Sequence, residues 1–322
     1  MIAEGRPVRA DRRRREVTRP RLVAIAGPTA AGKSALALEL ALRHGGEILN
    51  ADSRQVYRGM ELGTAAPTAA ERALVPHHLF GSAAPDDGYS LALFQRDARA
   101  ALDAVRRRGA FPWLVGGTGQ YVWALLEAWA VPEVPPDERL RAELAAFAEA
   151  NGPDALRAEL RAIDPVSADS IEPRNVRRVI RAIEVTRHTG RPFSESRSHA
   201  DPGFDFRVLG VDLPNDILHA RIDARVVAMF EGGLVDEVRA LLASGVSPEA
   251  PAMASIGYRQ VIRHLRGEIT IAEALAETQR ATRQLARRQR QWFRQTDARI
   301  TWVHGADEAW SAAGAFVRGE AP

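Results

Sequence analysis

The sequence contains Gly27-Pro28-Thr29-Ala30-Ala31-Gly32-Lys33-Ser34, a complete match to the pattern G-x-x-x-x-G-K-[ST]. An apolar run from Leu22 to Ala26 precedes the segment, and a helical pattern from Ser34 to Arg43 follows it. A strand, a glycine-rich turn and a helix in this order present backbone N–H groups, a helix dipole and a lysine to phosphate. We therefore predict a phosphate-binding loop, in which the Ser34 hydroxyl can ligate Mg²⁺.

Lys33 is the only lysine in the chain, because 43 of the 44 lysine and arginine residues are arginine. A compact ammonium on a flexible stem suits a phosphate loop better than a planar guanidinium does. The composition therefore favours phosphate chemistry at this one position.

Short apolar runs alternate with helical patterns on the C-terminal side of this loop. We predict further strands at residues 47–51, 77–80, 111–115, 207–213 and 299–303. Helical patterns occupy residues 91–108, 120–127 and much of the chain from 214 to 294. This alternation predicts an α/β fold, with a P-loop NTPase-like parallel sheet flanked by helices.

A proline-rich joint at residues 131–136 interrupts the alternation, and the pattern is helical from there to about residue 190. We therefore expect an all-helical insertion at residues 131–196. A core formed by residues 21–130 and 197–322 surrounds it, and the second part carries a basic C-terminal helix. Residues 1–20 are rich in arginine, and we expect them to form a disordered basic tail.

The composition excludes several classes of site. The chain has no cysteine, which excludes disulfides, thiolate catalysis and cysteine-ligated zinc. It has no run of about 18 apolar residues and no secretory signal, so we expect a cytoplasmic protein without membrane contact. The net charge is only +3, yet residues 280–299 carry seven arginines against Asp297 alone. Such a basic patch suggests a polyanionic partner.

Polar residues follow two predicted strands at the edge where open α/β sheets bind ligands. Asp52 could be a Mg²⁺ ligand, a general base or the cap of the next turn. Gln55 could read a base edge. Thr118 could act at the same site or could only cap the following helix.

Two groups of arginines could contact phosphate groups or a nucleic-acid backbone. The first is Arg177, Arg178 and Arg181, for which the spacing supports phosphate contact and a solvated face equally. The second is a stripe on the helix predicted at residues 279–294: Arg283, Arg287, Arg290 and Arg294. No acidic residue lies between 280 and 296, so we expect this stripe to face a nucleic-acid backbone.

His77 and His78 are adjacent on a predicted strand, where neighbouring side chains point to opposite faces. We therefore interpret them as structural residues or base contacts, and not as ligands of one metal ion.

Seven further segments extend the pattern of the loop. In chain order they are Asp52-Ser53-Arg54-Gln55-Val56-Tyr57-Arg58-Gly59-Met60, Leu62-Gly63-Thr64-Ala65, Pro76-His77-His78-Leu79, Leu114-Val115-Gly116-Gly117-Thr118-Gly119, Arg221-Ile222-Asp223-Ala224-Arg225, Ser255-Ile256-Gly257-Tyr258-Arg259-Gln260 and Thr282-Arg283-Gln284-Leu285-Ala286-Arg287-Arg288-Gln289. Together with the loop they resemble the tRNA dimethylallyltransferases, also called tRNA isopentenyltransferases. The block from Asp52 to Met60 beside the loop is the most specific.

The resemblance implies a reaction that the loop alone does not indicate. In this family the loop holds the diphosphate of dimethylallyl diphosphate rather than ATP, and Mg²⁺ assists. The N6 amine of adenosine 37, next to the anticodon of tRNAs reading U-initial codons, attacks the allylic carbon and diphosphate leaves. The partners would be a tRNA anticodon stem-loop and dimethylallyl diphosphate, and we expect a monomer.

The resemblance also implies roles for individual residues. Asp52 would be the general base. The leaving diphosphate would be stabilised by Lys33, Thr29, Ser34 and Arg225, with Arg221 as the alternative to Arg225. Thr118 would contact the flipped adenine. The residues implied to contact tRNA are Asp52, Ser53, Arg54, Gln55, Thr118, Arg141, Arg177, Arg178, Val179, Ile180, Arg181, Gly257, Tyr258, Arg259, Gln260, Arg283 and Arg287.

The sequence departs from the family in few places. Its first twenty residues have no counterpart in the family core, and Ser34 replaces a threonine without loss of the hydroxyl. A P-loop small-molecule or nucleotide kinase is the alternative function, although it does not explain the arginine stripe. A tRNA-binding module without catalysis is the other alternative, and the presence of Lys33, Asp52 and Thr118 argues against it.

Overall fold

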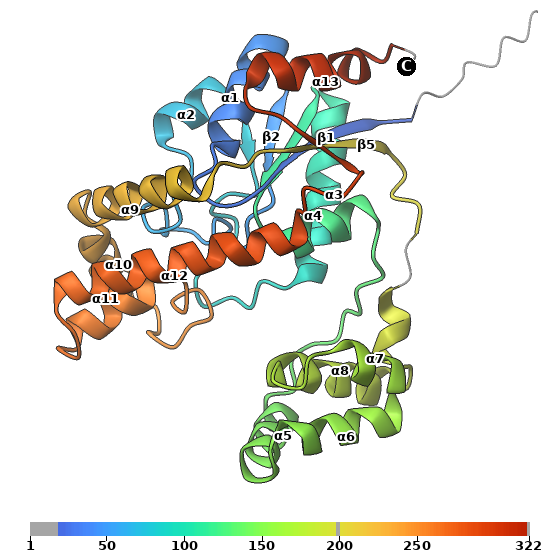
Figure 1. Cartoon of the computed structure of the whole chain (residues 1–322), viewed down its shortest axis with the longest axis vertical. Coiled ribbons are helices and arrows are strands. Elements are labelled where there is room, and N and C mark those ends of the chain that lie inside the picture. Colours follow the sequence, from blue (N-terminus) through green and yellow to red (C-terminus); the bar gives the residue numbers. More distant parts are fainter. Residues whose placement is uncertain (1–18, 198–199, 321–322) are drawn as a thin grey trace, which may run out of the picture.

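The computed structural model describes residues 19–197 and 200–320 (Figure 1). The tail predicted at residues 1–20 lies outside this range, except for Arg19 and Pro20. None of the helices in the described part of the chain has both the length and the apolar composition of a transmembrane span.

A parallel sheet forms the centre of the larger lobe. Its strands are β1 (Arg21–Ala26), β2 (Glu47–Asn50), β3 (His77–His78), β4 (Pro112–Gly116), β5 (Asp205–Gly210) and β6 (Ile300–Trp302). They lie in the order β3-β2-β4-β1-β5-β6, and every neighbouring pair is parallel. The α/β fold predicted from the sequence is therefore confirmed.

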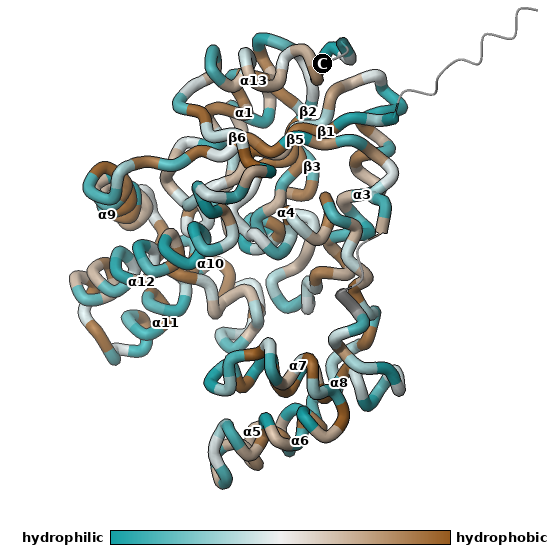
Figure 2. The backbone as a smooth tube through the Cα atoms, turned by 45° about the vertical axis from the view of Figure 1, so that its right-hand side comes forward, coloured by the Kyte–Doolittle hydropathy of each residue, from teal (hydrophilic) through white to brown (hydrophobic). Residues whose placement is uncertain are grey.

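Helices cover both faces of this sheet, which is why its central strands are continuous apolar runs (Figure 2). On one face, α1 (Lys33–His44) and α13 (Ala306–Arg318) pack on the side chains of Val23 and Ile25. On the other face, α3 (Leu91–Arg107) and α4 (Gly119–Leu126) pack on the alternate side chains of β1. The loops that follow β1, β2, β4 and β5 therefore meet at one edge of the sheet.

Four helices after β5 and one short helix between β2 and β3 complete the larger lobe. They are α9 (Asn215–Glu231), α10 (Leu234–Ala243), α11 (Tyr258–Leu265), α12 (Ile271–Trp292) and α2 (Ala69–Leu74). Helix α12 begins earlier than the predicted residue 279, because Thr270 and Glu273 form a capping box. The Thr270 hydroxyl accepts from the Glu273 N–H at 3.2 Å, and the Glu273 carboxylate accepts from the Thr270 N–H at 2.7 Å.

The remaining helices form a separate helical lobe (Figure 1). They are α5 (Glu138–Asn151), α6 (Pro153–Ile163), α7 (Pro165–Ser170) and α8 (Val176–Thr189), followed by a 3₁₀ turn at Phe193–Arg197. Proline begins both α6 and α7, where its missing N–H is not needed. The lobe has a hydrophobic core of its own, with Leu156, Leu160 and Ile183 fully buried.

Candidate active site

The loop after β1 has the backbone conformation that phosphate binding needs. Gly27, Ala30 and Gly32 have φ angles of 143°, 64° and 107°. A Cβ on Gly27 would lie 2.0 Å from the carbonyl oxygen of Val211, so only glycine allows this close approach to the chain after β5. Helix α1 begins directly after the loop, at Lys33, and points its N-terminal N–H groups into the same space.

Lys33 lies inside the loop, and its Nζ donates to the carbonyl oxygen of Pro28 at 2.7 Å. Burial lowers the pKa of Lys33 to about 8, although the carboxylate of Asp52 partly opposes this shift and Arg225 adds to it. Because water solvates this ammonium poorly, a bound anion should stabilise its charged form strongly.

Asp52 follows β2 and is held by the buried side chain of Asn50. The Asn50 Oδ1 accepts from the Asp52 N–H at 2.8 Å, and its Nδ2 donates to the carbonyl oxygens of Asp52 and Leu79 at 3.0 Å each. The Asp52 carboxylate accepts from the Arg54 N–H at 2.9 Å, so it caps the next turn. It also lines both cavities described below, so the capping and site interpretations of Asp52 are compatible.

Thr118 precedes α4, yet its side chain makes no capping hydrogen bond to that helix. The Thr118 Oγ1 instead accepts from the N–H of Ser53 at 3.0 Å and lies 3.3 Å from the Ser53 Oγ, to which it donates. Thr118 therefore ties the loop after β4 to the loop that carries Asp52.

Arg225, on α9, is the arginine that contacts the loop. It donates to the hydroxyl of Thr29, and its buried Nε has no hydrogen-bond partner among the described residues. Burial lowers the pKa of Arg225, and Asp52 opposes the shift. Arg221 lines the same cavity from one turn away. Buried donors without partners are uncommon and suggest a missing ligand.

Two cavities meet at these residues. The first, of about 410 Å³, contains the loop together with Lys33 and Ser34. The second, of about 560 Å³, opens toward Arg177 of the helical lobe and toward the inner side of α12. Both cavities are lined by Thr29, Asp52, Thr64, Gly117 and Arg225. Two substrates could therefore approach Asp52 from different sides.

Gln289 is a site residue that the sequence analysis missed. This buried side chain on α12 accepts from the N–H of Thr29 through Oε1 at 2.7 Å. Its Nε2 would lie 2.3 Å from a Cβ on Gly117, so the glycine makes room for it. Gln289 ends one of the segments quoted above, and its place in that segment was the available signal.

Several predicted RNA contacts line the second cavity, namely Ser53, Arg54, Thr118, Arg177 and Arg259. Gln55 does not. Its side chain lines the first cavity and donates to the carbonyl oxygens of Thr64 and Ala65 at 3.0 and 2.9 Å, so Gln55 positions a loop.

Four predicted contacts have side chains that are buried and unavailable to RNA. Val179 and Ile180 lie in the core of the helical lobe, because they occupy the inner face of α8. The Tyr258 hydroxyl donates to Glu237 at 2.6 Å, and the Gln260 Oε1 accepts from the N–H of Gly257 at 2.9 Å. Contact between tRNA and the segments that carry these four residues stays a prediction, and the burial leaves it to the backbone and to neighbouring side chains.

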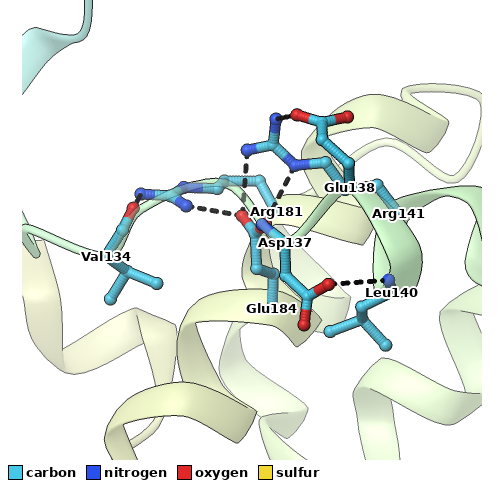
Figure 3. Close-up of polar contacts among 7 residues, drawn as sticks. All are labelled: Val134, Asp137, Glu138, Leu140, Arg141, Arg181 and Glu184. Carbon is cyan, nitrogen blue, oxygen red and sulfur yellow. Dashed lines mark hydrogen bonds and ion pairs between the residues drawn. The ribbon is translucent and has the colours of Figure 1, made fainter.

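Arg141 and Arg181 are also engaged within the protein (Figure 3). Both donate to Glu184, which is only 1% exposed, and Arg141 does so at 2.8 and 3.0 Å. Burial opposes ionisation of Glu184, but these donors and the N–H of Asp137 outweigh it and lower its pKa. Arg181 also donates to Val134 O at 3.0 Å. This network fastens the entry of the helical lobe to α8.

The arginine stripe on α12 has acidic partners after all, contributed by other elements. Arg283 pairs with Asp223 on α9, and Arg290 donates to Asp212 after β5 at 2.7–3.1 Å. The lack of acidic residues within residues 280–296 therefore does not leave these two arginines unpaired, and RNA contact by the stripe stays a prediction. Arg287 lines a groove with them, away from the two cavities.

The two histidines have separate environments. His77 lines the first cavity and its Nδ1 lies 2.7 Å from the carbonyl oxygen of Val75, whereas the His78 Nε2 contacts Glu47 at 2.5 Å. In residues 19–197 and 200–320, no cluster of three or more histidine, aspartate or glutamate side chains could hold a metal ion.

A search against protein-family models gives a match over most of the chain. Residues 55–296 match the model for IPP transferase, and residues 20–75 match that for isopentenyl transferase. The chain belongs to the tRNA dimethylallyltransferase family. A family member from Thermomicrobium roseum is 46% identical over 90% of this chain and 88% of its own length. One from Streptomyces coelicolor is 48% identical over 89% and 91%.

Solved structures of this tRNA dimethylallyltransferase family have the same fold. The tRNA isopentenylpyrophosphate transferase from Bacillus halodurans is 39% identical, covers 93% of this chain and 96% of its own, and has a TM-score of 0.66. A eukaryotic dimethylallyltransferase acting on tRNA has a TM-score of 0.77 at 25% identity, over 94% of this chain and 80% of its own.

Proposed function

We propose that this protein transfers the dimethylallyl group of dimethylallyl diphosphate to N6 of adenosine 37 in tRNA. The products are N6-isopentenyladenosine and diphosphate, which makes the enzyme a prenyltransferase. The observation that carries the proposal is the junction of the phosphate-loop cavity and a second, arginine-lined cavity at Asp52 and Arg225. We expect the enzyme to act as a monomer. We expect it in the cytoplasm, where both substrates are present.

The first cavity would hold the diphosphate. Lys33, the Thr29 hydroxyl, Arg225 and the N–H groups of the loop all converge there. As the bond between C1 and the bridging oxygen breaks, negative charge develops on the diphosphate. Cations and dipoles fixed beforehand in a site with little water stabilise that charge without rearranging.

Asp52 would act from the other side of the breaking bond. An adenosine stacked in the anticodon loop cannot reach this depth, so the base must be flipped into the second cavity. As the N6–C1 bond forms, the N6 proton passes to the Asp52 carboxylate and diphosphate leaves. Thr118 and Ser53, which hydrogen-bond to each other beside Asp52, keep the two loops of this cavity in register.

The donor set fits Mg²⁺ bound mainly by the substrate. Ser34 offers one exposed hydroxyl at the start of α1, with the Asp52 carboxylate lining the same cavity. Mg²⁺ usually takes one or two protein ligands and completes its shell with phosphate oxygens and water. When bound, it would neutralise charge on the diphosphate, and Ser34 would hold it.

A transfer assay tests this function. The protein is incubated with Mg²⁺, dimethylallyl diphosphate labelled in the prenyl chain, and tRNA that lacks the modification. We expect label in tRNA at adenosine 37, and no label when that position is changed to guanosine. Label-free tRNA together with ATP turnover would instead indicate the kinase alternative.

Asp52→Ala is the decisive variant in this assay. Loss of a general base should lower turnover by about 10²-fold or more and leave tRNA affinity nearly unchanged. A variant with the normal rate would remove Asp52 from this role.

A further inference from the structure

Trp292 is a large apolar side chain that stands at the rim of the second cavity. It is the last residue of α12, 38% of it is exposed, and it lines this cavity beside Thr118 and Gln120. Other exposed apolar side chains, such as Ile217 and Ile271, line none of the cavities described here. A partly exposed indole that lines a cavity beside the candidate active site therefore needs an explanation.

The indole packs against neighbouring residues of the larger lobe. It lies against the backbone of Gly119, where a Cβ would come within 2.2 Å of the indole Cγ, so a side chain at 119 would displace it. The ring centre of Trp129 is 6.4 Å away, and Trp123 donates through Nε1 to the carbonyl oxygen of Trp292 at 3.3 Å. An aromatic surface that is packed on one side and partly open to water suits a planar partner.

The rest of the cavity indicates the chemistry of that partner. Arg177, Arg259 and Arg288 line the same opening, and Asp52, at the junction with the first cavity, is the one carboxylate among its lining residues. Guanidinium groups around an aromatic ring form the usual binding site for an unstacked nucleotide, since the cations bind phosphate and the ring stacks on the base.

We propose that Trp292 is the stacking platform for a nucleobase directly next to the adenosine that is modified. This inference rests on the proposed function. The modified base must reach Asp52, which lines both cavities, whereas Trp292 lines only the second one. When adenosine 37 leaves the stack, its neighbours at positions 36 and 38 lose a stacking partner, and the indole replaces it for one of them.

The test uses the full-length enzyme and anticodon stem-loop RNAs that carry 2-aminopurine at position 36, 37 or 38. Stacking on an indole quenches this fluorescent base. We expect wild-type enzyme to quench the probe at position 36 or 38, and Trp292→Leu to abolish that quenching. Trp292→Leu should also raise the KM for tRNA by about tenfold, since stacking on an aromatic ring contributes that order of affinity.

Matched variants separate stacking from folding. Trp292→Phe keeps an aromatic face and should retain most of the affinity and quenching. Trp310→Leu removes an indole from α13, where it stacks on His44, and should change neither. The KM for dimethylallyl diphosphate should stay constant in all three variants, which a general loss of structure would not allow.

RNAs with an abasic nucleotide, which lacks the base expected to stack on Trp292, identify the position that is bound. If Trp292 stacks on base 38, an abasic site at 38 should lower the affinity of wild-type enzyme for the RNA. It should not lower the affinity of Trp292→Leu any further. If Trp292 stacks on base 36, an abasic site at 36 should have these effects. The inference fails if neither position couples to Trp292, or if Trp292 couples only to a probe at 37. If the wild-type enzyme transfers no label at all, the proposed function fails first.

Discussion

Helix α12 has two different faces. The face with more arginines is not the face that lines the candidate active site. The inner face lines the second cavity with Thr278, Thr282, Arg288, Gln289 and Trp292. The outer face lines a groove against α9 with arginines 280, 283, 287 and 290. At 3.6 residues per turn these two sets point in roughly opposite directions.

The two faces differ in whether the protein already neutralises their cations. On the outer face, Arg283 pairs with Asp223 and Arg290 pairs with Asp212. On the inner face, Arg288 is exposed and has no hydrogen bond or ion pair to any described residue. An arginine with a carboxylate partner supports the fold, whereas an unpaired one beside a cavity is available to an anion. The following variants test this distinction.

Arg290→Ala should have the largest effect, and the effect should be on stability. Arg290 donates to Asp212 and to the carbonyl oxygen of Leu213, and Asp212 is only 10% exposed, so the variant leaves a nearly buried carboxylate unpaired. We expect the free energy of unfolding to fall by about 2 kcal/mol, somewhat less than for a fully buried pair. Urea denaturation followed by circular dichroism measures it.

The control for Arg290 is Arg294→Ala. Arg294 is exposed, and within the described part of the chain it donates only to the carbonyl oxygen of Gln291. Its removal should change stability by no more than a few tenths of a kcal/mol. Equal losses in the two variants would contradict the structural role of the Arg290 pair.

Gln289→Leu should act on catalysis. The leucine fills a similar volume but leaves the N–H of Thr29 without its acceptor, in the loop that would hold diphosphate. An unsatisfied buried donor costs roughly 1–3 kcal/mol, so we expect kcat/KM for dimethylallyl diphosphate to fall by about tenfold. Gln284→Leu, on the exposed outer face, should leave it unchanged. A normal kcat/KM for Gln289→Leu would show that the loop does not depend on this bond.

Arg288→Ala and Arg287→Ala form a pair of neighbouring exposed arginines that differ in the face they occupy. The sequence predicted an RNA contact for Arg287 and none for Arg288. From the structure we expect a several-fold rise in the tRNA KM for Arg288→Ala, with the salt slope of binding reduced by about one. The effect of Arg287→Ala should be smaller. If Arg287→Ala is the more damaging variant, the outer face binds RNA and our ranking of the faces is reversed.

The sequence predicted features that depend on residues close in the chain. The loop around Lys33, the strand before it and Asp52 after the next strand are local patterns, and the parallel sheet followed from their alternation. The ion pairs of α12 could not be predicted in this way, because Arg283 and Arg290 meet partners 60 and 78 residues earlier. The contact of Gln289 with Thr29 spans 260 residues and exists only once α12 lies beside the loop.

The smallest expected effect, and the most specific one, concerns Lys33, an ammonium without an ion pair to a carboxylate of the described residues. Its pKa is about 8 without ligand, against 10.5 for an ordinary lysine, because it is buried. In the free enzyme the unfolded chain therefore binds more protons than the folded protein between pH 8 and 10.5, so the stability of the folded state rises with pH in that window. Bound diphosphate should raise the pKa of Lys33 again, because an anion favours the charged ammonium.

Binding of diphosphate should then be coupled to proton uptake. Near pH 6.5, Lys33 is protonated with or without ligand, and we expect it to take up no proton. Near pH 8.5, which is above the pKa of Lys33, part of the free enzyme lacks the proton on this residue, so each binding event should take up a fraction of a proton. Calorimetric titrations in buffers of different ionisation enthalpy measure this number. In Lys33→Arg the guanidinium is charged throughout, so the difference in uptake between pH 6.5 and 8.5 should shrink by that fraction. If wild type and Lys33→Arg show the same uptake at pH 8.5, Lys33 is not the cation that diphosphate binds.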